Sequence, residues 1–128
     1  PITVKDNIDL QGTDATLGVR SRQGRPAHTD APVVRQLKEA GALVLGKTNV
    51  PQLLLAQETE NAIWGVTPNP WNLERVPGGS SGGEAAAIAA GLSPCGIGTD
   101  MKLEIIRSST SSLMRCTLTC GYSAECPR

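Results

Sequence analysis

The chain has 128 residues, in which 12 lysines and arginines balance 12 aspartates and glutamates. This length fits one small domain, and a zero net charge argues against nucleic acid or an anionic membrane surface as the main partner. No apolar run approaches the ~18–20 residues that span a bilayer, and no signal peptide with a basic start is visible, so we expect no membrane segment.

The first hundred residues alternate between strand and helix patterns. Residues 1–4 are typical of a short strand, and residues 30–41 predict a helix that begins at an Asp N-cap and ends at a Gly. Residues 42–45 are a continuous apolar run, which favours a strand covered by helices on both faces. Further helices are expected over residues 49–58 and, rich in alanine, over residues 83–90. This alternation predicts an α/β sheet.

The composition changes after Asp100. Thirteen of the fourteen glycines lie within residues 1–101, whereas residues 102–128 hold one glycine, five serines, three threonines and three cysteines. Residues 108–112 (Ser-Ser-Thr-Ser-Ser) suit neither a helix nor a strand, so we expect an irregular and poorly packed tail. The chain therefore divides into residues 1–100 and a divergent segment, residues 101–128.

The four cysteines all lie in the last third of the chain, at Cys95, Cys116, Cys120 and Cys126. Their spacing is a poor match to structural zinc sites, which pair ligands two to four residues apart and need four of them. We expect free thiols in a reducing compartment, which favours the cytoplasm.

Residues 41–48 satisfy the phosphate-loop pattern, but a working phosphate loop follows a strand and opens a helix. Here a predicted helix precedes Gly41, and the intervening apolar residues are themselves the predicted strand. Because amides within a sheet ladder cannot cradle phosphate, we interpret Lys47 and Thr48 as a strand-to-helix turn beside the functional site rather than as a nucleotide site.

A glycine–serine run precedes the alanine-rich helix, at residues 77–84 (Pro-Gly-Gly-Ser-Ser-Gly-Gly-Glu). Such a run lets the backbone approach a ligand closely, and the following helix N-terminus favours developing negative charge. A plain flexible loop is the alternative. Together with residues 69–71 (Asn-Pro-Trp), residues 96–100 (Gly-Ile-Gly-Thr-Asp) and residues 1–7 around Lys5, however, the run resembles the amidase signature family of serine hydrolases, over nearly all of residues 1–100.

The resemblance implies a partial amidase signature fold, in which an incomplete mixed sheet is flanked by helices. It also implies amide C–N bond hydrolysis of a small amide or ester, without a metal or organic cofactor. Lys5 is implied as the base, because a lysine desolvated at the end of a buried strand has a lowered pKa. Ser80 is implied as the relay serine on a cis peptide bond, with Ser81 beside it in the site. Residues 50–52 and Glu84 look most like the branch that contains fatty acid amide hydrolases.

The position of the nucleophile departs from the family pattern. The family spacing from the relay serine, counted from Ser80, reaches Glu104, where the family carries its nucleophilic serine. The glycine pair expected before that serine is replaced by Lys102 and Leu103, whose Cβ atoms would obstruct the backbone path of an oxyanion hole. Sliding the alignment by one residue places Ile105 there instead, so neither register restores a serine.

These departures predict that the chain is inactive although its family hydrolyses amides. A truncated or mis-spliced product, or a reading-frame slip, would each explain the loss of resemblance after Asp100. The alternative function is a non-catalytic fragment that acts as an interaction or regulatory module. Such a fragment would leave sheet edges and apolar faces uncovered, and we would expect it to self-associate or to bind a partner.

Overall fold

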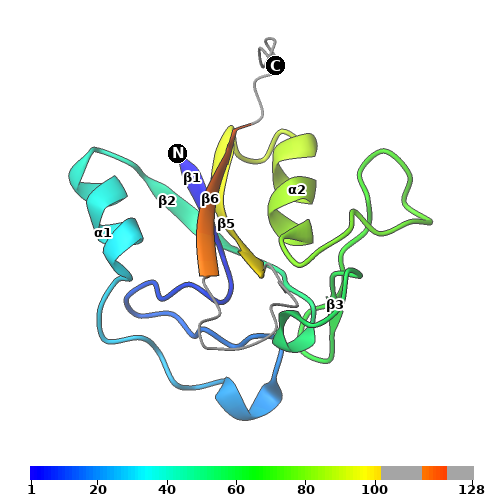
Figure 1. The fold of residues 1–128 in the computed structure, drawn as a ribbon, viewed down its shortest axis with the longest axis horizontal. Coiled ribbons are helices and arrows are strands. Elements are labelled where there is room, and N and C mark those ends of the chain that lie inside the picture. Colours follow the sequence, from blue (N-terminus) through cyan, green and yellow to red (C-terminus); the bar gives the residue numbers. More distant parts are fainter. Residues whose placement is uncertain (102–113, 121–128) are drawn as a thin grey trace, which may run out of the picture.

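The structure, a computed structural model, describes residues 1–101 and 114–120. Its main sheet has four strands in the order β2-β1-β5-β6. Figure 1 shows them at the centre of the described chain. The strands are β1 (Ile2–Lys5), β2 (Val44–Thr48), β5 (Cys95–Met101) and β6 (Met114–Cys120). Strand β1 runs parallel to β2 and β5, whereas β6 is antiparallel to β5. The sheet is therefore mixed, and the predicted α/β class is confirmed.

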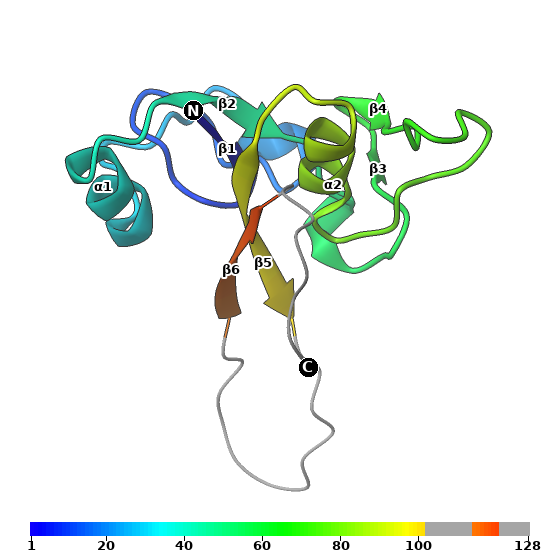
Figure 2. The ribbon, with the colours of Figure 1, turned by 90° about the horizontal axis from the view of Figure 1, so that it is seen from above.

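Among the described residues, two α-helices accompany the sheet, α1 (Pro32–Glu39) and α2 (Gly82–Ala89), and they lie on opposite sides of it (Figures 1 and 2). The connections contain short elements: the 3₁₀ helices η1 (Arg20–Arg22) and η2 (Gln52–Leu54), and a hairpin of β3 (Glu60–Asn61) with β4 (Gly65–Val66). The alanine-rich helix α2 confirms the prediction within one residue at each end.

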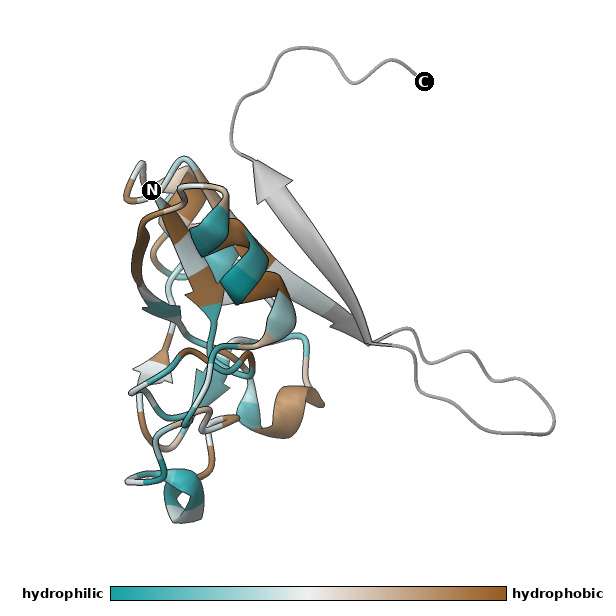
Figure 3. Cartoon of the chain, turned by 90° about the vertical axis from the view of Figure 1, so that its left-hand side faces the viewer, coloured by the Kyte–Doolittle hydropathy of each residue, from teal (hydrophilic) through white to brown (hydrophobic). Residues whose placement is uncertain are grey.

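Alternate residues of β1 serve the two faces of the sheet. Ile2 and Val4 join the apolar core on the side of α1, whose buried residue is Val34. The other side chains of this core are Ile8, Leu10 and Ile97. Thr3 and Lys5 bond to Glu84 and Ser80, which places them on the side of α2. In Figure 3, α1 faces the viewer. Hydrophilic and hydrophobic residues alternate along this helix, as expected for a helix that packs on one side only. Because successive side chains of a strand point to opposite faces, Lys5 lies on the face of the sheet opposite the apolar core.

The first predicted helix is present but begins later than expected. Ala31 is the N-cap and Pro32 the first residue of α1. The Asp30 carboxylate instead accepts hydrogen bonds from the Gln11 amide at 2.8 Å and from Lys38 Nζ at 2.7 Å. Gly41 follows the helix with φ +90°, a conformation that glycine adopts without strain. The helix is therefore closed at its C-terminus as predicted, whereas the predicted aspartate cap was wrong.

Two further expectations need correction. Strand β2 spans Val44–Thr48 rather than residues 42–45, and it is not covered on both faces, because Leu45 is 51% exposed. The predicted helix over residues 49–58 is replaced by the single turn η2. There Leu53 has φ 54°, and its amide donates to the carbonyl of Leu17 at 2.8 Å. That tertiary hydrogen bond takes the amide away from an α-helical partner, so the helix does not continue.

Part of the predicted irregular tail is a strand. β6 pairs with β5 along seven residue pairs, from Cys95 opposite Cys120 to Met101 opposite Met114, and Figure 2 shows the two strands side by side. Glu104, Lys102 and the serine-rich residues 108–112 lie outside the described residues.

Gly83 allows α2 to begin in close contact with the turn after β2. A Cβ atom at Gly83 would overlap the backbone nitrogen and oxygen of Asn49, which cannot move aside as a flexible side chain would. We expect Gly83→Ala to lower the free energy of unfolding by about 2 kcal/mol or more, because overpacking outweighs the gain of about 1 kcal/mol in helix propensity.

Urea unfolding measures this effect, with Gly46→Ala in β2 as the matched control. Gly46 has open space at its Cβ position and no positive φ, so its replacement is expected to change the free energy of unfolding by less than about 0.5 kcal/mol. Equal unfolding midpoints for the two variants would show that the approach of α2 to Asn49 is not tight.

Candidate active site

Lys5 occupies the end of an inner strand and is fully buried. Its position between β2 and β5 removes it from water, and its side chain points toward α2. The ammonium nitrogen Nζ donates to Ser80 Oγ at 2.7 Å and to the Thr99 carbonyl at 3.0 Å. The structure thus brings the predicted base and the predicted relay serine into direct contact.

Ser80 lies in the loop that leads into α2, and the Gly79–Ser80 peptide bond is cis. The loop requires glycines. Gly78 has φ +90°, and a Cβ atom at Gly79 would lie 2.8 Å from the Gln57 carbonyl oxygen. Ser80 is half-buried, so its hydroxyl contacts the buried lysine while remaining partly accessible to solvent. This arrangement suits a group that passes a proton between the interior and a reacting molecule.

Ser81 is placed differently from Ser80. Its hydroxyl donates to the Thr99 carbonyl at 3.1 Å, and the Thr99 amide approaches Ser81 Oγ at 3.4 Å. The Thr99 carbonyl therefore accepts hydrogen bonds from both Lys5 and Ser81, and the Thr99 hydroxyl accepts one from Asn7 at 3.3 Å. Ser81 and Thr99 consequently fasten the glycine–serine loop to β5, and Asn7 fastens the segment after β1 to the same residue.

Glu84 belongs to this region, although the sequence singled it out only as a marker of a family branch. It is 1% exposed, and its carboxylate accepts hydrogen bonds from the hydroxyls of Thr3 at 2.6 Å and Thr48 at 2.7 Å. Burial raises the pKa of Glu84, whereas the two hydroxyls and the charge of Lys5 oppose that rise. A glutamate in the first turn of a helix is common on surfaces, so its burial gave no signal in the sequence.

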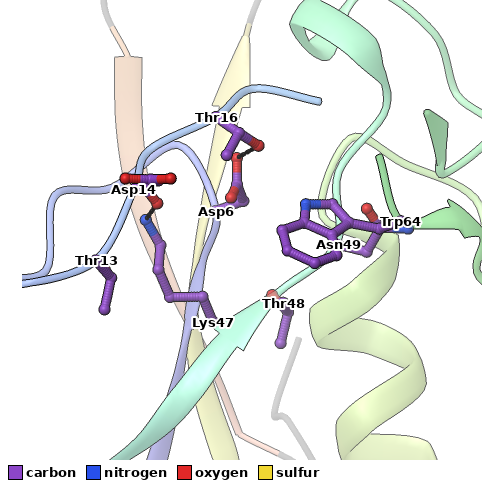
Figure 4. A pocket seen from close by; sticks show the side chains of 8 residues that line it. All are labelled: Asp6, Thr13, Asp14, Thr16, Lys47, Thr48, Asn49 and Trp64. Atoms are coloured by element: carbon purple, nitrogen blue, oxygen red, sulfur yellow. Dashed lines mark hydrogen bonds between the residues drawn. The ribbon is translucent and has the colours of Figure 1, made fainter. Parts of the chain in front are cut away.

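A cavity of about 460 Å³ lies beside the ends of β1 and β2 (Figure 4). Lys47 points from β2 to the Asp14 carbonyl at 2.7 Å, and burial lowers its pKa, opposed by nearby aspartates. Asp6 accepts hydrogen bonds from the Thr16 hydroxyl at 3.0 Å and the Leu17 amide at 2.7 Å. The remaining lining residues are Thr13, Thr48, Asn49 and Trp64. Lys47 and Thr48 are the last residues of β2, so their interpretation as a strand-to-helix turn was wrong. The phosphate-loop pattern ends within a strand and does not open a helix.

The remaining predictions concern the cysteines, metal binding, membrane segments and the position of the nucleophile. Cys95 is a free cysteine, and the other three cysteines have no described side chains. Within residues 1–101 and 114–120, no three His, Cys, Asp or Glu side chains gather as a metal site would require. No helix in that same part of the chain has the length and apolar character to cross a membrane. The expected nucleophile position, Glu104, lies outside the described residues.

Comparisons with known proteins point to one family. The family model described as Amidase matches residues 1–102. The putative amidase AmiB2 of Mycobacterium tuberculosis (strain ATCC 25618 / H37Rv) is 52% identical over 100 residues, which are 78% of this chain and 21% of that protein. A glutamyl-tRNA(Gln) amidotransferase subunit of Methanococcoides burtonii is 48% identical over 100 residues, with the same coverage. The chain therefore spans about one-fifth of the length of these curated relatives.

Solved structures give the same result. A glutamyl-tRNA(Gln) amidotransferase subunit from Thermotoga maritima superposes with a TM-score of 0.75 at 44% identity, covering 79% of this chain and 22% of that one. 6-Aminohexanoate cyclic dimer hydrolase superposes with a TM-score of 0.76 at 43% identity and the same coverage. At these identities, the similarity extends beyond the fold to the amino-acid sequence of the covered segment.

Proposed function

This chain belongs to the amidase signature family, and on that premise we propose that residues 1–101 carry the proton-transfer half of a serine amidase site. The substrate class is a small molecule with an amide or ester bond. The observation that carries the proposal is the 2.7 Å contact between the fully buried Lys5 Nζ and Ser80 Oγ. In this arrangement Lys5 is the base and Ser80 the relay.

In the proposed relay, the hydrogen bond between Lys5 and Ser80 is reversed: Ser80 is the donor and Lys5 is the acceptor. A neutral Lys5 amine directs one N–H to the Thr99 carbonyl and receives the hydroxyl proton of Ser80. Ser80 Oγ then takes the proton of a nucleophilic serine as that serine attacks the carbonyl carbon of the substrate. A heavy-atom distance of 2.7 Å permits proton transfer in either direction. Ser81 and Asn7 hold Thr99, and so the strand beside the relay, in place.

The relay in this chain lacks a nucleophile. Glu104 stands where the family carries its serine, and a carboxylate would bring a second negative charge to a developing oxyanion. We therefore propose that this chain does not hydrolyse amides by itself, although its first hundred residues carry a functional base and relay.

A chimaera tests the proposed base and relay directly. Residues 1–100 of this chain would replace the matching segment of 6-aminohexanoate cyclic dimer hydrolase, which then supplies the nucleophile and the rest of the domain. We expect the chimaera to hydrolyse the cyclic dimer, since the two segments are 43% identical and superpose with a TM-score of 0.76. A folded chimaera without hydrolysis, beside an active intact host, would contradict the proposal.

A narrower substrate, a fatty acid amide, is supported only by residues 50–52 and Glu84. Val50 and Glu84 are both buried within the fold, so these residues would mark a branch of the family rather than contact an acyl chain. An intact enzyme that carries them should hydrolyse a long-chain amide faster than a short one. Equal rates for the two amides would remove this narrower proposal.

A second candidate function is an interaction module, favoured by the exposed apolar residues of the β2 edge. Leu43 and Leu45 are 65% and 51% exposed, and β2 has no second strand partner within the described sheet. An exposed edge with apolar side chains favours pairing with another chain. We expect light scattering after size-exclusion chromatography to show dimers or larger species, and Leu45→Lys to reduce them. A monomer with one sharp thermal transition would contradict this function.

A further inference from the structure

Glu84 is a buried titratable group that the proposed relay does not use. We propose that it is a positioning residue, which holds the start of α2 against Lys5 and balances the charge of Lys5 when that lysine is protonated. This inference rests on the proposed function, because it assigns a second residue to the same relay.

The two hydrogen-bond partners of the Glu84 carboxylate are neighbours of Lys5 in the sheet. One oxygen, Oε2, accepts a hydrogen bond from the hydroxyl of Thr3, which lies two residues before Lys5 on the same face of β1. The other oxygen, Oε1, accepts a hydrogen bond from the hydroxyl of Thr48, which is the partner of Lys5 in the β1–β2 register. The carboxylate is therefore bonded to two of the nearest neighbours of the lysine on its own face of the sheet.

The sheet leaves space for this carboxylate. Gly96 of β5 lies opposite Thr3 in the β1–β5 register. A Cβ atom at Gly96 would overlap Glu84 Oε2 and would lie 2.7 Å from both Glu84 Cδ and Thr3 Oγ1. The glutamate of α2 and the glycine of β5 thus fit each other, and a larger residue at position 96 would displace the carboxylate.

The same contacts fix the relay serine. Glu84 lies in the first turn of α2, which begins at Gly82, directly after Ser80 and Ser81. Its two hydrogen bonds attach that turn to β1 and β2. Because Ser80 is four residues before Glu84, the position of its hydroxyl relative to Lys5 depends on this attachment. The partial positive charge of the helix N-terminus also favours a carboxylate here.

The charges around Glu84 are few. Among the described residues, Lys5 is the charged group that acts on Glu84. Asp6 faces Thr16 and Leu17 instead, and Lys47 points to Asp14 (Figure 4). Both oxygens of Glu84 accept hydrogen bonds, as those of an ionised carboxylate do. When Lys5 takes a proton from Ser80, the new ammonium and this carboxylate form a neutral buried pair, so the charge on Lys5 is compensated.

Lysine NMR tests the coupling in the intact chain. With ¹³Cε-labelled lysine, the four signals are Lys5, Lys38, Lys47 and Lys102, and Lys5→Met assigns the first. We expect Glu84→Gln, which keeps the shape but removes the charge, to move the titration of Lys5 to lower pH. The titration of Lys47, which donates to the Asp14 carbonyl, should stay in place.

Glu39→Gln is the matched control, because Glu39 is exposed and pairs only weakly with Arg35 at 3.9 Å. It should leave the titration of Lys5 unchanged. If Glu84→Gln does not fold, the reciprocal experiment replaces it. We expect Lys5→Met to raise the pKa of Glu84, which is measured by NMR of the chain with ¹³Cδ-labelled glutamate. An unchanged titration of Lys5 in folded Glu84→Gln, or of Glu84 in Lys5→Met, would overturn the inference.

Hydrolysis by the chimaera separates this inference from the proposed function. In an active chimaera, Glu84→Gln should shift the acid limb of the kcat/KM profile to lower pH, because a base with a lower pKa is deprotonated earlier. A purely structural role would lower the rate without moving that limb. An inactive chimaera with intact coupling between Glu84 and Lys5 would count against the proposed function alone.

Discussion

Replacing Lys5 by methionine in the active chimaera is expected to lower kcat/KM for the cyclic dimer by about 10²–10⁴-fold, the usual contribution of a general base. Methionine fills a similar volume in a fully buried position but cannot accept the proton of Ser80. Lys5→Arg should be equally inactive, because a guanidinium stays protonated and cannot act as a base. Lys38→Met is the matched control, since Lys38 is a partly exposed lysine paired with Asp30.

The arginine variant separates two roles for Lys5. If the residue served only as a positive charge that orients Ser80, Lys5→Arg would keep much of the hydrolysis that Lys5→Met loses. Comparable losses in both variants, together with unchanged urea unfolding, would assign the loss to proton transfer. Full activity in Lys5→Met would remove the lysine from the mechanism.

The strands and helices that carry the site were predictable where local signals agreed. Residues 1–4 form a short and largely apolar segment, and β1 lies within one residue of that prediction. The alanine-rich segment includes a glycine pair at its start, and α2 also lies within one residue of its predicted bounds. The Lys5–Ser80 pair was expected from motif resemblance rather than from periodicity, since these residues are 75 positions apart in the sequence. Only the parallel sheet, with β5 beside β1, brings the loop before α2 to the end of β1.

The errors arose where tertiary contacts outweighed local preference. In η2, the amide of Leu53 bonds to Leu17, which is far away in the sequence, and this prevents the helix that Asn49 and Pro51 were expected to start. Leu45 belongs to an apolar run that indicated a strand buried on both faces, yet β2 is an edge strand of the described sheet. Sequence patterns indicate which residues are apolar, but not which neighbours cover them.

The role of Glu84 was unpredictable for a related reason. Buried glutamates are rare, so a glutamate in the first turn of a helix is ordinarily expected to face solvent. Its burial depends on Gly96, Thr3 and Thr48, which come from three different strands. No local window of sequence contains more than one of these partners.

The unmodified chain is expected to show no amide or ester hydrolysis above background and no covalent labelling by a fluorophosphonate, which reacts with activated serines. Lys5 Nζ and Ser80 Oγ lie 2.7 Å apart, as the proposed relay requires, but the expected position of the nucleophile holds Glu104, which cannot form a serine adduct. Mass spectrometry of the labelled chain measures this directly, with the intact cyclic dimer hydrolase as the positive control.

Glu104→Ser alone should not restore hydrolysis. An oxyanion hole built from successive amides requires the backbone freedom of two glycines, and Lys102 and Leu103 occupy those positions. Loss of one such donor costs about 3–4 kcal/mol of transition-state stabilisation, so a restored hydroxyl would act without the groups that make its attack fast. Labelling of the unmodified chain at Ser80, Ser81 or Ser108 would show that another serine has become the nucleophile, and the expectation of inactivity would then be wrong.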